Sequence, residues 1–281
     1  MIEDTAMSNY KCPIDQLVHT TVRIECQTPQ GTSCGSGYFF DFMSDKGCIP
    51  CIVTNKHVVA GATTGNIHLT IKDNDGVPKL GEHEQINFQN FENLWISHPD
   101  PQIDLAIFPL APLLQQAEQQ NINFYRIALS KEIVATDMLL NTLSTMIEII
   151  MIGYPNGLWD KKHNLPIIRR GITATHPRLS LNNKPEFMID AACFPGSSGS
   201  PVFLANIGSF VNDKGAFCAG SRIAFVGTLY AGPQYSAKGE IEIVEVPTAQ
   251  KSIAQSLIPI NLGLVIQANK ILDFESVLNK L

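Results

Sequence analysis

The sequence has no long apolar run: its 281 residues contain no stretch of about 18 consecutive apolar residues, the length of a membrane-spanning helix. Basic clusters are also scarce, because 20 Lys and Arg are outnumbered by 26 Asp and Glu and adjoin only at Lys161-Lys162 and Arg169-Arg170. These absences argue against a membrane and against nucleic acid as partners. The polar start, Met1 to Ser8, lacks the apolar core of a secretory signal, so we expect a soluble protein, cytoplasmic if Met1 is its native start.

Cysteine usage argues against a complete disulfide framework, since the chain has seven cysteines, an odd number, and no export signal. One Cys-x-x-Cys pair, Cys48 and Cys51, has a spacing that redox and zinc sites also use. A second such pair is missing, and this one stands at the entrance of an apolar strand. We therefore interpret both as structural thiols and expect no metal and no cofactor; a thiol pair or a metal at these positions is the open alternative.

What the sequence does contain is a series of short β-strand patterns separated by turns. They occupy residues 16–26, 35–42, 51–54, 66–72, 85–88 and 104–109 in the first half and residues 147–152, 167–173, 187–192, 201–204 and 223–229 in the second. Such a series is typical of all-β barrels and sandwiches. A helix-friendly stretch, 111–121, connects the halves, and apolar residues at helical spacing predict an amphipathic helix over 264–281 that docks on the second half.

A stretch rich in glycine and serine, Cys193 to Phe203, lies between two apolar flanks. Gly196 and Gly199 let the backbone turn with unusual dihedrals and let a carbonyl group approach the N–H groups of the turn. The hydroxyl between these glycines belongs to Ser198, which such a turn would expose as a nucleophile. Taken alone, the stretch is more often an ordinary hairpin turn, so partners elsewhere in the chain have to decide.

Two residues in the first half supply those partners. An activated serine needs a base within hydrogen-bond reach and a carboxylate that orients the base. His57 follows the strand 51–54, and Asp104 begins the apolar run 104–109. Each is an ordinary strand-end or turn residue when considered alone. Together with Ser198 they form the order His, Asp, Ser, with intervals of 47 and 94 residues.

With this order the sequence resembles the trypsin-like serine peptidases of the chymotrypsin clan, in particular their bacterial branch. The resemblance covers residues 16–266. Five motifs carry it in family order: Gly35 to Phe40, Val53 to Val59, Asp104 to Ala106, Gly153 to Pro155 and Gly196 to Pro201.

The resemblance implies an all-β fold of two six-stranded antiparallel β-barrels with a C-terminal α-helix. The chain would divide into an N-terminal extension over 1–15, a first barrel over 16–125, a second barrel over 126–263, and a helix over 264–281 packed on the second barrel. The base and the acid would lie in the first barrel and the nucleophile in the second.

The resemblance also implies a role for each site residue. Ser198 would be the nucleophile, His57 the general base and then acid, and Asp104 the orienting carboxylate. The N–H groups of Gly196 and Ser198 would form the oxyanion hole. The substrate would contact Ala192, Leu229, Tyr230 and Ala231.

Three positions depart from the usual family pattern or bear on specificity. Ser197 stands where the family usually has Asp, and Ser200 where it has a second Gly. In secreted members that Asp pairs with a newly cleaved N-terminus, so the oxyanion hole here must be held by other contacts. Ala192 brings no acidic group to the base of the specificity pocket, so we expect a small or apolar residue before the scissile bond.

The resulting hypothesis is a serine endopeptidase that hydrolyses protein or peptide substrates through an acyl-enzyme, with a regulatory protein partner as an open option. The rival hypothesis is a catalytically silent protease fold that serves as a binding or scaffold module. An α/β-hydrolase needs a histidine after its nucleophile, but the last histidine is His176. Cys193 lies five residues before the centre of the turn, and a metallohydrolase pattern, His-x-x-x-His, is missing.

Overall fold

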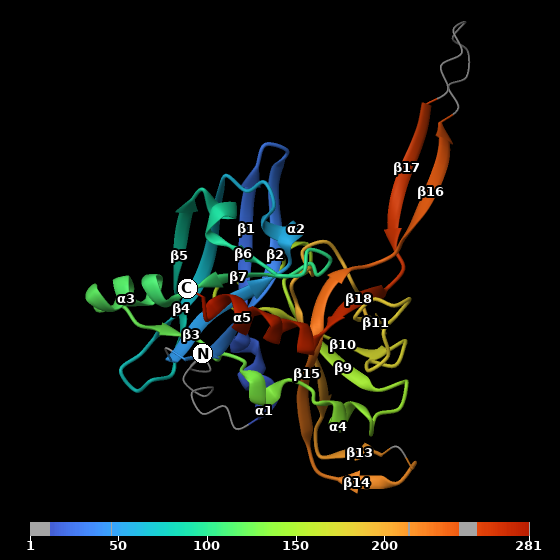
Figure 1. Ribbon diagram of the computed structural model, residues 1–281. Helices are drawn as coiled ribbons and strands as arrows, with labels where there is room; N and C mark the ends of the chain where they lie inside the picture. The colour runs from blue at the N-terminus through green and yellow to red at the C-terminus, as the bar shows by residue number, and fades with distance from the viewer. Residues whose placement is uncertain (1–11, 46, 213, 242–251, 281) are drawn as a thin grey trace, which may run out of the picture.

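A sheet of eight strands makes up most of the first half of the chain in the computed structural model, which describes residues 12–45, 47–212, 214–241 and 252–280. The strands pair in the order β5-β4-β1-β2-β3-β7-β6, with β8 beside β4. Their bounds are β1 Thr21–Thr28, β2 Gly31–Ser44, β3 Gly47–Thr54, β4 Thr64–Lys72, β5 Pro78–Gln89, β6 Ile96–Ser97, β7 Ala106–Pro109 and β8 Phe124–Tyr125 (Figure 1).

A closed barrel of six strands forms the second half, in the order β10-β11-β18-β15-β12-β9. Its strands are β9 Glu148–Gly153, β10 Ile167–Thr173, β11 Glu186–Asp190, β12 Pro201–Asn206, β15 Arg222–Ala231 and β18 Leu262–Gln267. Two hairpins extend from it: β13 Ser209–Val211 with β14 Phe217–Ala219, and β16 Gln234–Ile241 with β17 Ser252–Pro259. Figure 1 shows the second hairpin reaching away from the barrel.

Short helices connect and cover these strands. The α-helices are α1 Pro13–Leu17, α2 Lys56–Val59, α3 Ala111–Gln119, α4 Asp137–Leu140 and α5 Glu275–Leu278, and the 3₁₀ helices are η2 Val18–Thr20, η3 Phe91–Leu94, η4 Lys131–Ile133, η5 Pro155–Gly157 and η6 Ala268–Phe274. No helix among the described residues is long and apolar enough to cross a membrane.

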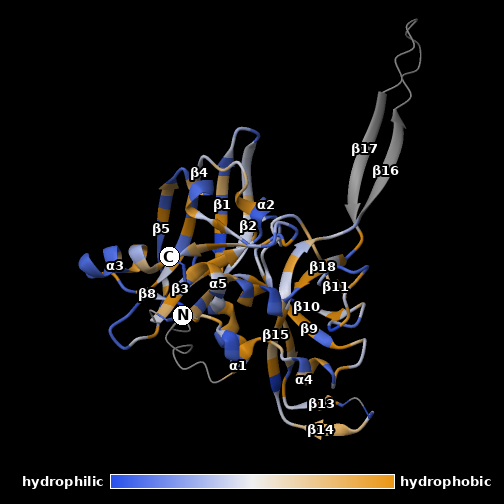
Figure 2. Cartoon of the chain, in the orientation of Figure 1, coloured by the Kyte–Doolittle hydropathy of each residue, from blue (hydrophilic) through white to orange (hydrophobic). Residues whose placement is uncertain are grey.

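Strand β2 packs against both halves of the molecule. Its six consecutive residues 35–40 are buried, so neither face of the strand is open to solvent there. Phe39 packs inside the first half, whereas Tyr38 and Phe40 belong to a cluster that includes Phe203 and Phe225 of the barrel. The rings of Tyr38 and Phe225 lie 5.3 Å apart. Burying each such ring contributes about 1.5–3 kcal/mol. By contrast, β1 alternates between apolar buried and polar residues, visible as alternating bands in Figure 2, because its second face is more open.

The structure confirms a closed six-stranded barrel in the second half. In the first half, the described strands pair along an open path from β5 to β6, so a closed first barrel stays a prediction. The prediction that the C-terminal helix begins at residue 264 is wrong. Residues 262–267 form β18, which pairs with β11 and β15, and the helical segment begins only at Ala268 and is mostly 3₁₀. The helix-friendly stretch 111–121 does contain α3.

Candidate active site

The predicted base and acid lie side by side at the ends of two paired strands. Thr54, the last residue of β3, pairs with Ala106, the first of β7, so that His57 in α2 and Asp104 before β7 are neighbours. His57 Nδ1 lies 2.5 Å from Asp104 Oδ2, and the His57 N–H donates to Asp104 Oδ1 at 3.2 Å. Asn55 also holds the backbone of Asp104, since its side-chain amide donates to the Asp104 backbone carbonyl at 2.7 Å.

The hydrogen bond to Asp104 determines which imidazole nitrogen is available. A carboxylate at Nδ1 favours the tautomer with the proton on Nδ1 and leaves Nε2 free to accept one. The His57 side chain is 49% exposed and can therefore be reached by a substrate, while that of Asp104 is 25% exposed. This is the arrangement that a general base requires.

Ser198 lies on the turn before β12, and both halves of the molecule hold it. The Ser36 N–H, from β2, donates to the Ser198 carbonyl at 2.9 Å. The Ser198 hydroxyl donates to the Tyr230 carbonyl at 3.4 Å; within the described residues, no hydrogen bond joins it to His57. Gly199 has φ +85°, and a Cβ there would lie 1.9 Å from the Ser36 carbonyl oxygen, so this close approach of the halves requires glycine.

Hydrogen bonds fix the loop just before Ser198, which carries the predicted oxyanion-hole residue Gly196. The Pro195 carbonyl accepts the Asn156 N–H at 2.5 Å. Because a trans peptide points its carbonyl and its N–H in opposite directions, the Gly196 N–H points away from Asn156. Ser36 Oγ donates to the Gly196 carbonyl at 2.9 Å and accepts the Tyr154 N–H at 2.9 Å. Two N–H groups, those of Gly196 and Ser198, are thus held in one turn.

A comparison with known protein families assigns the chain. The model of the trypsin-like peptidase domain family matches residues 35–211, which is more than half of the chain. The chain belongs to the trypsin-like serine peptidases. It is accordingly a serine endopeptidase, as the sequence predicted, and the matched region includes all three predicted triad positions.

Solved structures of other peptidases are similar to this one. The Rv3671c protease from M. tuberculosis in its active form is 16% identical with a TM-score of 0.44, and the match covers 95% of this chain and 84% of that one. The HtrA-type protease AlgW with a tripeptide is 16% identical with a TM-score of 0.48, covering 95% and 62%. The serine endoprotease from Yersinia pestis is 16% identical with a TM-score of 0.45, covering 94% and 64%.

The peptidase thus spans less than two thirds of the length of the last two chains. No curated protein sequence matches it.

A pocket of about 320 Å³ lies beside Ser198 of the peptidase. It is lined by Cys193, Phe194, Pro195, Ser198, Leu229, Ala231, Gly232 and Pro233, a set without a charged side chain. Burial raises the pKa of Cys193 to about 11, so its thiol is neutral at physiological pH. The predicted substrate residues Leu229 and Ala231 therefore line the pocket, whereas Ala192 does not.

Tyr230, the remaining predicted substrate residue, lines a different cavity. This cavity of about 430 Å³ is also lined by Asp104, Lys184 and Glu186. The Tyr230 hydroxyl donates to Glu186, and burial together with this carboxylate raises the pKa of Tyr230 well above its usual value. The Tyr230 backbone faces Ser198, but its side chain does not enter the pocket beside Ser198.

Sequence reasoning missed several contributors to the site. Ser36 and Asn156 hold the turn, and Cys193 lines the pocket beside Ser198. Ser36 lies within the motif Gly35 to Phe40, and Asn156 directly follows the motif Gly153 to Pro155. The motifs mark these segments, but the contacts of the two residues depend on how the halves pack.

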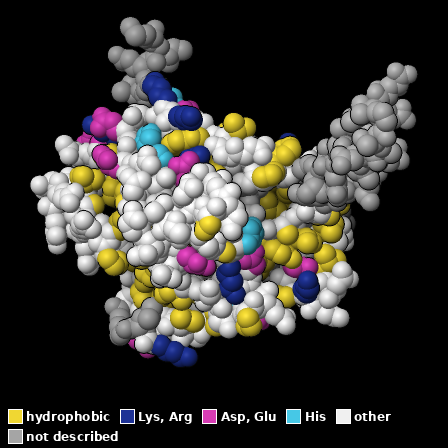
Figure 3. Space-filling model, turned by 90° about the horizontal axis from the view of Figure 1, so that it is seen from above, with side chains coloured by type: hydrophobic (Ala, Val, Ile, Leu, Met, Phe, Trp, Pro, Cys, Tyr) yellow, Lys and Arg dark blue, Asp and Glu magenta, His cyan; other side chains and the backbone are white. Residues whose placement is uncertain are grey.

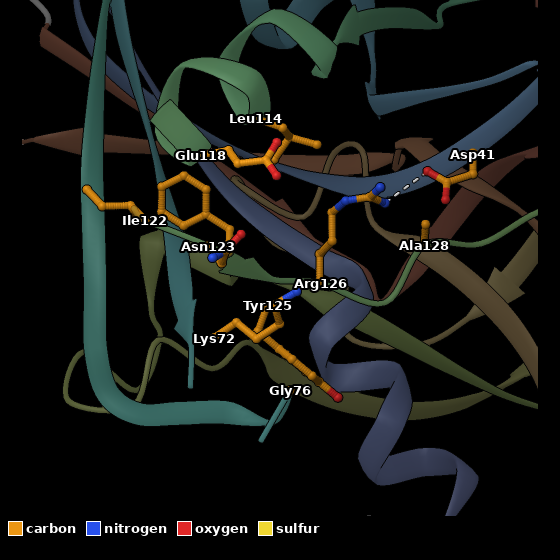
Figure 4. A pocket seen from close by; sticks show the side chains of 11 residues that line it. Asp41, Lys72, Gly76, Leu114, Glu118, Ile122, Asn123, Tyr125, Arg126 and Ala128 are labelled. Carbon is orange, nitrogen blue, oxygen red and sulfur yellow. Dashed lines mark hydrogen bonds and ion pairs between the residues drawn. The ribbon is translucent and has the colours of Figure 1, made fainter. Parts of the chain in front are cut away.

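The expected structural thiols are free cysteines. All seven cysteines are unpaired, and burial raises the pKa of Cys51 to about 12. Among the described residues, no group of three or more His, Cys, Asp and Glu side chains could hold a metal ion. A polar pocket of about 470 Å³, in which Arg126 forms an ion pair with Asp41, contains none of the predicted site residues (Figure 4). Figure 3 shows charged side chains of both signs interspersed with apolar ones on the face that it views.

Proposed function

We propose that this peptidase hydrolyses peptide bonds through an acyl-enzyme formed on Ser198, with His57 and Asp104 completing the triad. The carrying observation is the 2.5 Å contact between His57 Nδ1 and Asp104 Oδ2, which leaves Nε2 as the base. The first-half sheet would act as the first barrel of the family and the closed barrel as the second.

In the first step, the Ser198 oxygen attacks the scissile carbonyl carbon while His57 Nε2 takes the hydroxyl proton. The negative charge on the former carbonyl oxygen is stabilised by the N–H groups of Gly196 and Ser198. His57 then donates its proton to the leaving amine, and the acyl-enzyme remains. Water repeats the sequence, with His57 again as base, and releases the acid product and free Ser198.

The substrate chain would pair with the backbone of β15. A bulge between Leu229 and Ala231 interrupts the pairing of β15 with β18. The Tyr230 carbonyl there accepts a hydrogen bond from the Ser198 hydroxyl. A peptide N–H can replace that hydroxyl as the donor to Tyr230, as an added strand does at a sheet edge. The exchange releases the Ser198 hydroxyl for His57.

We propose a small or apolar side chain before the scissile bond, because the pocket beside Ser198 has no charged lining residue. Cleavage of a peptide library, with product sequences read by mass spectrometry, measures this preference. Efficient cleavage only after Lys or Arg would contradict it.

The test of the proposed mechanism compares the wild type with Ser198→Ala. Wild-type protein should react with a fluorophosphonate probe and cleave peptides, and Ser198→Ala should lose the labelling and about 10⁶-fold in kcat. Ser180→Ala, at an exposed serine outside the site, serves as the control and should match the wild type. A wild type that neither reacts with the probe nor cleaves any peptide would support the alternative, a silent binding or scaffold module.

A further inference from the structure

Arg169 extends from β10 to the loop that leads to the nucleophile. Its Nη1 donates to the Ala192 carbonyl at 2.5 Å and to the Ser197 hydroxyl oxygen at 2.8 Å. The same hydroxyl oxygen accepts the Phe194 N–H at 3.2 Å. One nitrogen of Arg169 therefore connects the start of the loop 192–197 to its end.

The guanidinium is buried without a compensating charge. Its Nε and Nη2 atoms have almost no accessible surface and no hydrogen-bond partner in the described part of the chain, and no described carboxylate forms an ion pair with it. Burial lowers the pKa of Arg169, and the nearby thiol of Cys193 is neutral at physiological pH. Burying an unpaired cation destabilises a fold, so an arrangement of this kind points to a functional demand on the loop.

Ser197 is the residue through which this contact reaches the oxyanion hole. It lies between Gly196 and Ser198, is 1% exposed, and its N–H donates to the Phe194 carbonyl at 3.0 Å. Holding its side chain limits rotation of the peptide group that follows it, which carries the Ser198 N–H. The Gly196 N–H lies in the Pro195–Gly196 peptide, inside the loop 192–197 whose two ends Arg169 connects. Ser36 and Asn156 hold the same turn from its other side.

We propose that Arg169 is a positioning residue that holds the oxyanion hole in its working geometry through Ser197 and Ala192. This inference rests on the proposed function, since it assigns a role in the same acyl-transfer site. The usual family residue at position 197 is an Asp, which in secreted members fixes the turn through an ion pair. Here the Ser197 hydroxyl accepts a hydrogen bond from Arg169 instead, so the turn is held without a carboxylate at this position.

The test compares Arg169→Met, Arg169→Lys and Ser197→Ala with the wild type on a peptide that the wild type cleaves. Arg169→Met removes the donors and should lower kcat about 10- to 100-fold while KM changes less than about threefold, because ground-state contacts to the substrate remain. Arg169→Lys should recover most of the loss, since both contacts come from one nitrogen and an ammonium group can make both. The double variant Arg169→Met with Ser197→Ala should lose little more than the worse single variant.

A peptide aldehyde separates positioning from general loosening. It accepts the Ser198 oxygen at its carbonyl carbon, the hydroxyl proton passes to His57, and the resulting oxygen anion lies in the oxyanion hole. We expect the affinity of Arg169→Met for the aldehyde to fall by the same factor as kcat/KM, while its affinity for the corresponding product peptide stays within about threefold of the wild type.

Arg170→Met is the matched control, since Arg170 is the next residue of β10, is 72% exposed and pairs with Glu148 at the surface. It should leave every measured quantity within about twofold. Equal losses of aldehyde and product-peptide affinity in Arg169→Met, or no loss of either, would overturn the role of Arg169 while the activity of the wild type stood. A wild type inactive in the Ser198-dependent assay would instead overturn the proposed function, and this inference with it.

Discussion

The two halves of the molecule prepare their parts of the site in different ways. In the first half, His57 and Asp104 are already in contact, brought together by the pairing of β3 with β7. In the second half, the Ser198 hydroxyl donates to Tyr230 of its own barrel, and the turn that carries it accepts hydrogen bonds from Ser36 across the boundary. The proposed acid and base are thus positioned by one sheet, whereas the position of the proposed nucleophile depends on how the halves meet.

This difference shows which parts of the site can fail separately. Loss of Asp104 should disable the proposed base without disturbing the oxyanion hole, since the Asp104 carboxylate bonds to His57 and, among the described residues, makes no hydrogen bond to the turn that carries Ser198. Loss of an interfacial contact such as Ser36 should disturb the turn and leave the pair of His57 and Asp104 intact.

Among the variants that act on one half alone, the largest effect is expected from Asp104→Asn. An amide at this position can donate to Nδ1, which favours the tautomer with the proton on Nε2, so His57 can no longer accept a proton from Ser198. We expect kcat to fall about 10⁴-fold, measured as initial rates of peptide hydrolysis at neutral pH. Affinity for a product peptide should stay within about threefold.

Asp100→Asn is the control for this experiment, because Asp100 lies in the turn before Asp104. Among the described residues its side chain accepts a hydrogen bond only from the Gln102 N–H. It should retain wild-type kcat within about threefold. A similar large loss of kcat in both variants would mean that catalysis depends on the structure of this turn and not on the carboxylate of Asp104.

A smaller effect is expected from Ser36→Ala, which tests the boundary between the halves. The change removes the donor to the Gly196 carbonyl and leaves the buried Tyr154 N–H without its acceptor. We expect kcat to fall about 100-fold, because the turn loses one of its supports. The pair of His57 and Asp104 should be unaffected, which the histidine Nδ1 proton resonance reports by NMR.

Ser33→Ala, at an exposed position of the same strand, provides the control and should behave as the wild type. If Ser36→Ala keeps full activity, the turn is stable without the boundary, and the contrast between the halves does not hold for catalysis.

Much of the site followed from the sequence because local patterns carry it. His57 and Asp104 stand at the ends of apolar strand runs, and Gly196 and Gly199 flank Ser198 in a turn that needs positive φ. Short strands with turns between them predicted an all-β chain. These are properties of neighbouring residues, so one sequence is enough to infer them.

What the sequence did not predict depends on contacts between distant residues. Arg169 and Ser197 are 28 positions apart, and Ser36 and Gly196 are 160 apart, so nothing local indicates that they meet. The helical spacing near the C-terminus led to a wrong helix start, because Leu264 to Ile266 form a short continuous apolar run that fits a buried strand as well as a helix. Pairing with β11 and β15 decides between the two. Tertiary pairing overrides a weak periodic signal there.

The smallest expected effect concerns the stability of the first half. His19 is 6% exposed, its ring meets the edge of Tyr125 at 5.0 Å, and burial lowers its pKa to about 4 from 6.5. Below pH 6.5 the unfolded chain binds a proton that the folded chain refuses, so the free energy of unfolding falls with falling pH until the folded pKa near 4 is reached. Between pH 7 and pH 5 the protonation of His19 alone lowers the free energy of unfolding by about 2 kcal/mol.

Urea unfolding of the wild type and of His19→Gln at both pH values measures this change. The free energy of unfolding of the variant should fall by about 2 kcal/mol less than that of the wild type. An equal fall in the free energy of unfolding of both proteins would assign the acid sensitivity to groups other than His19.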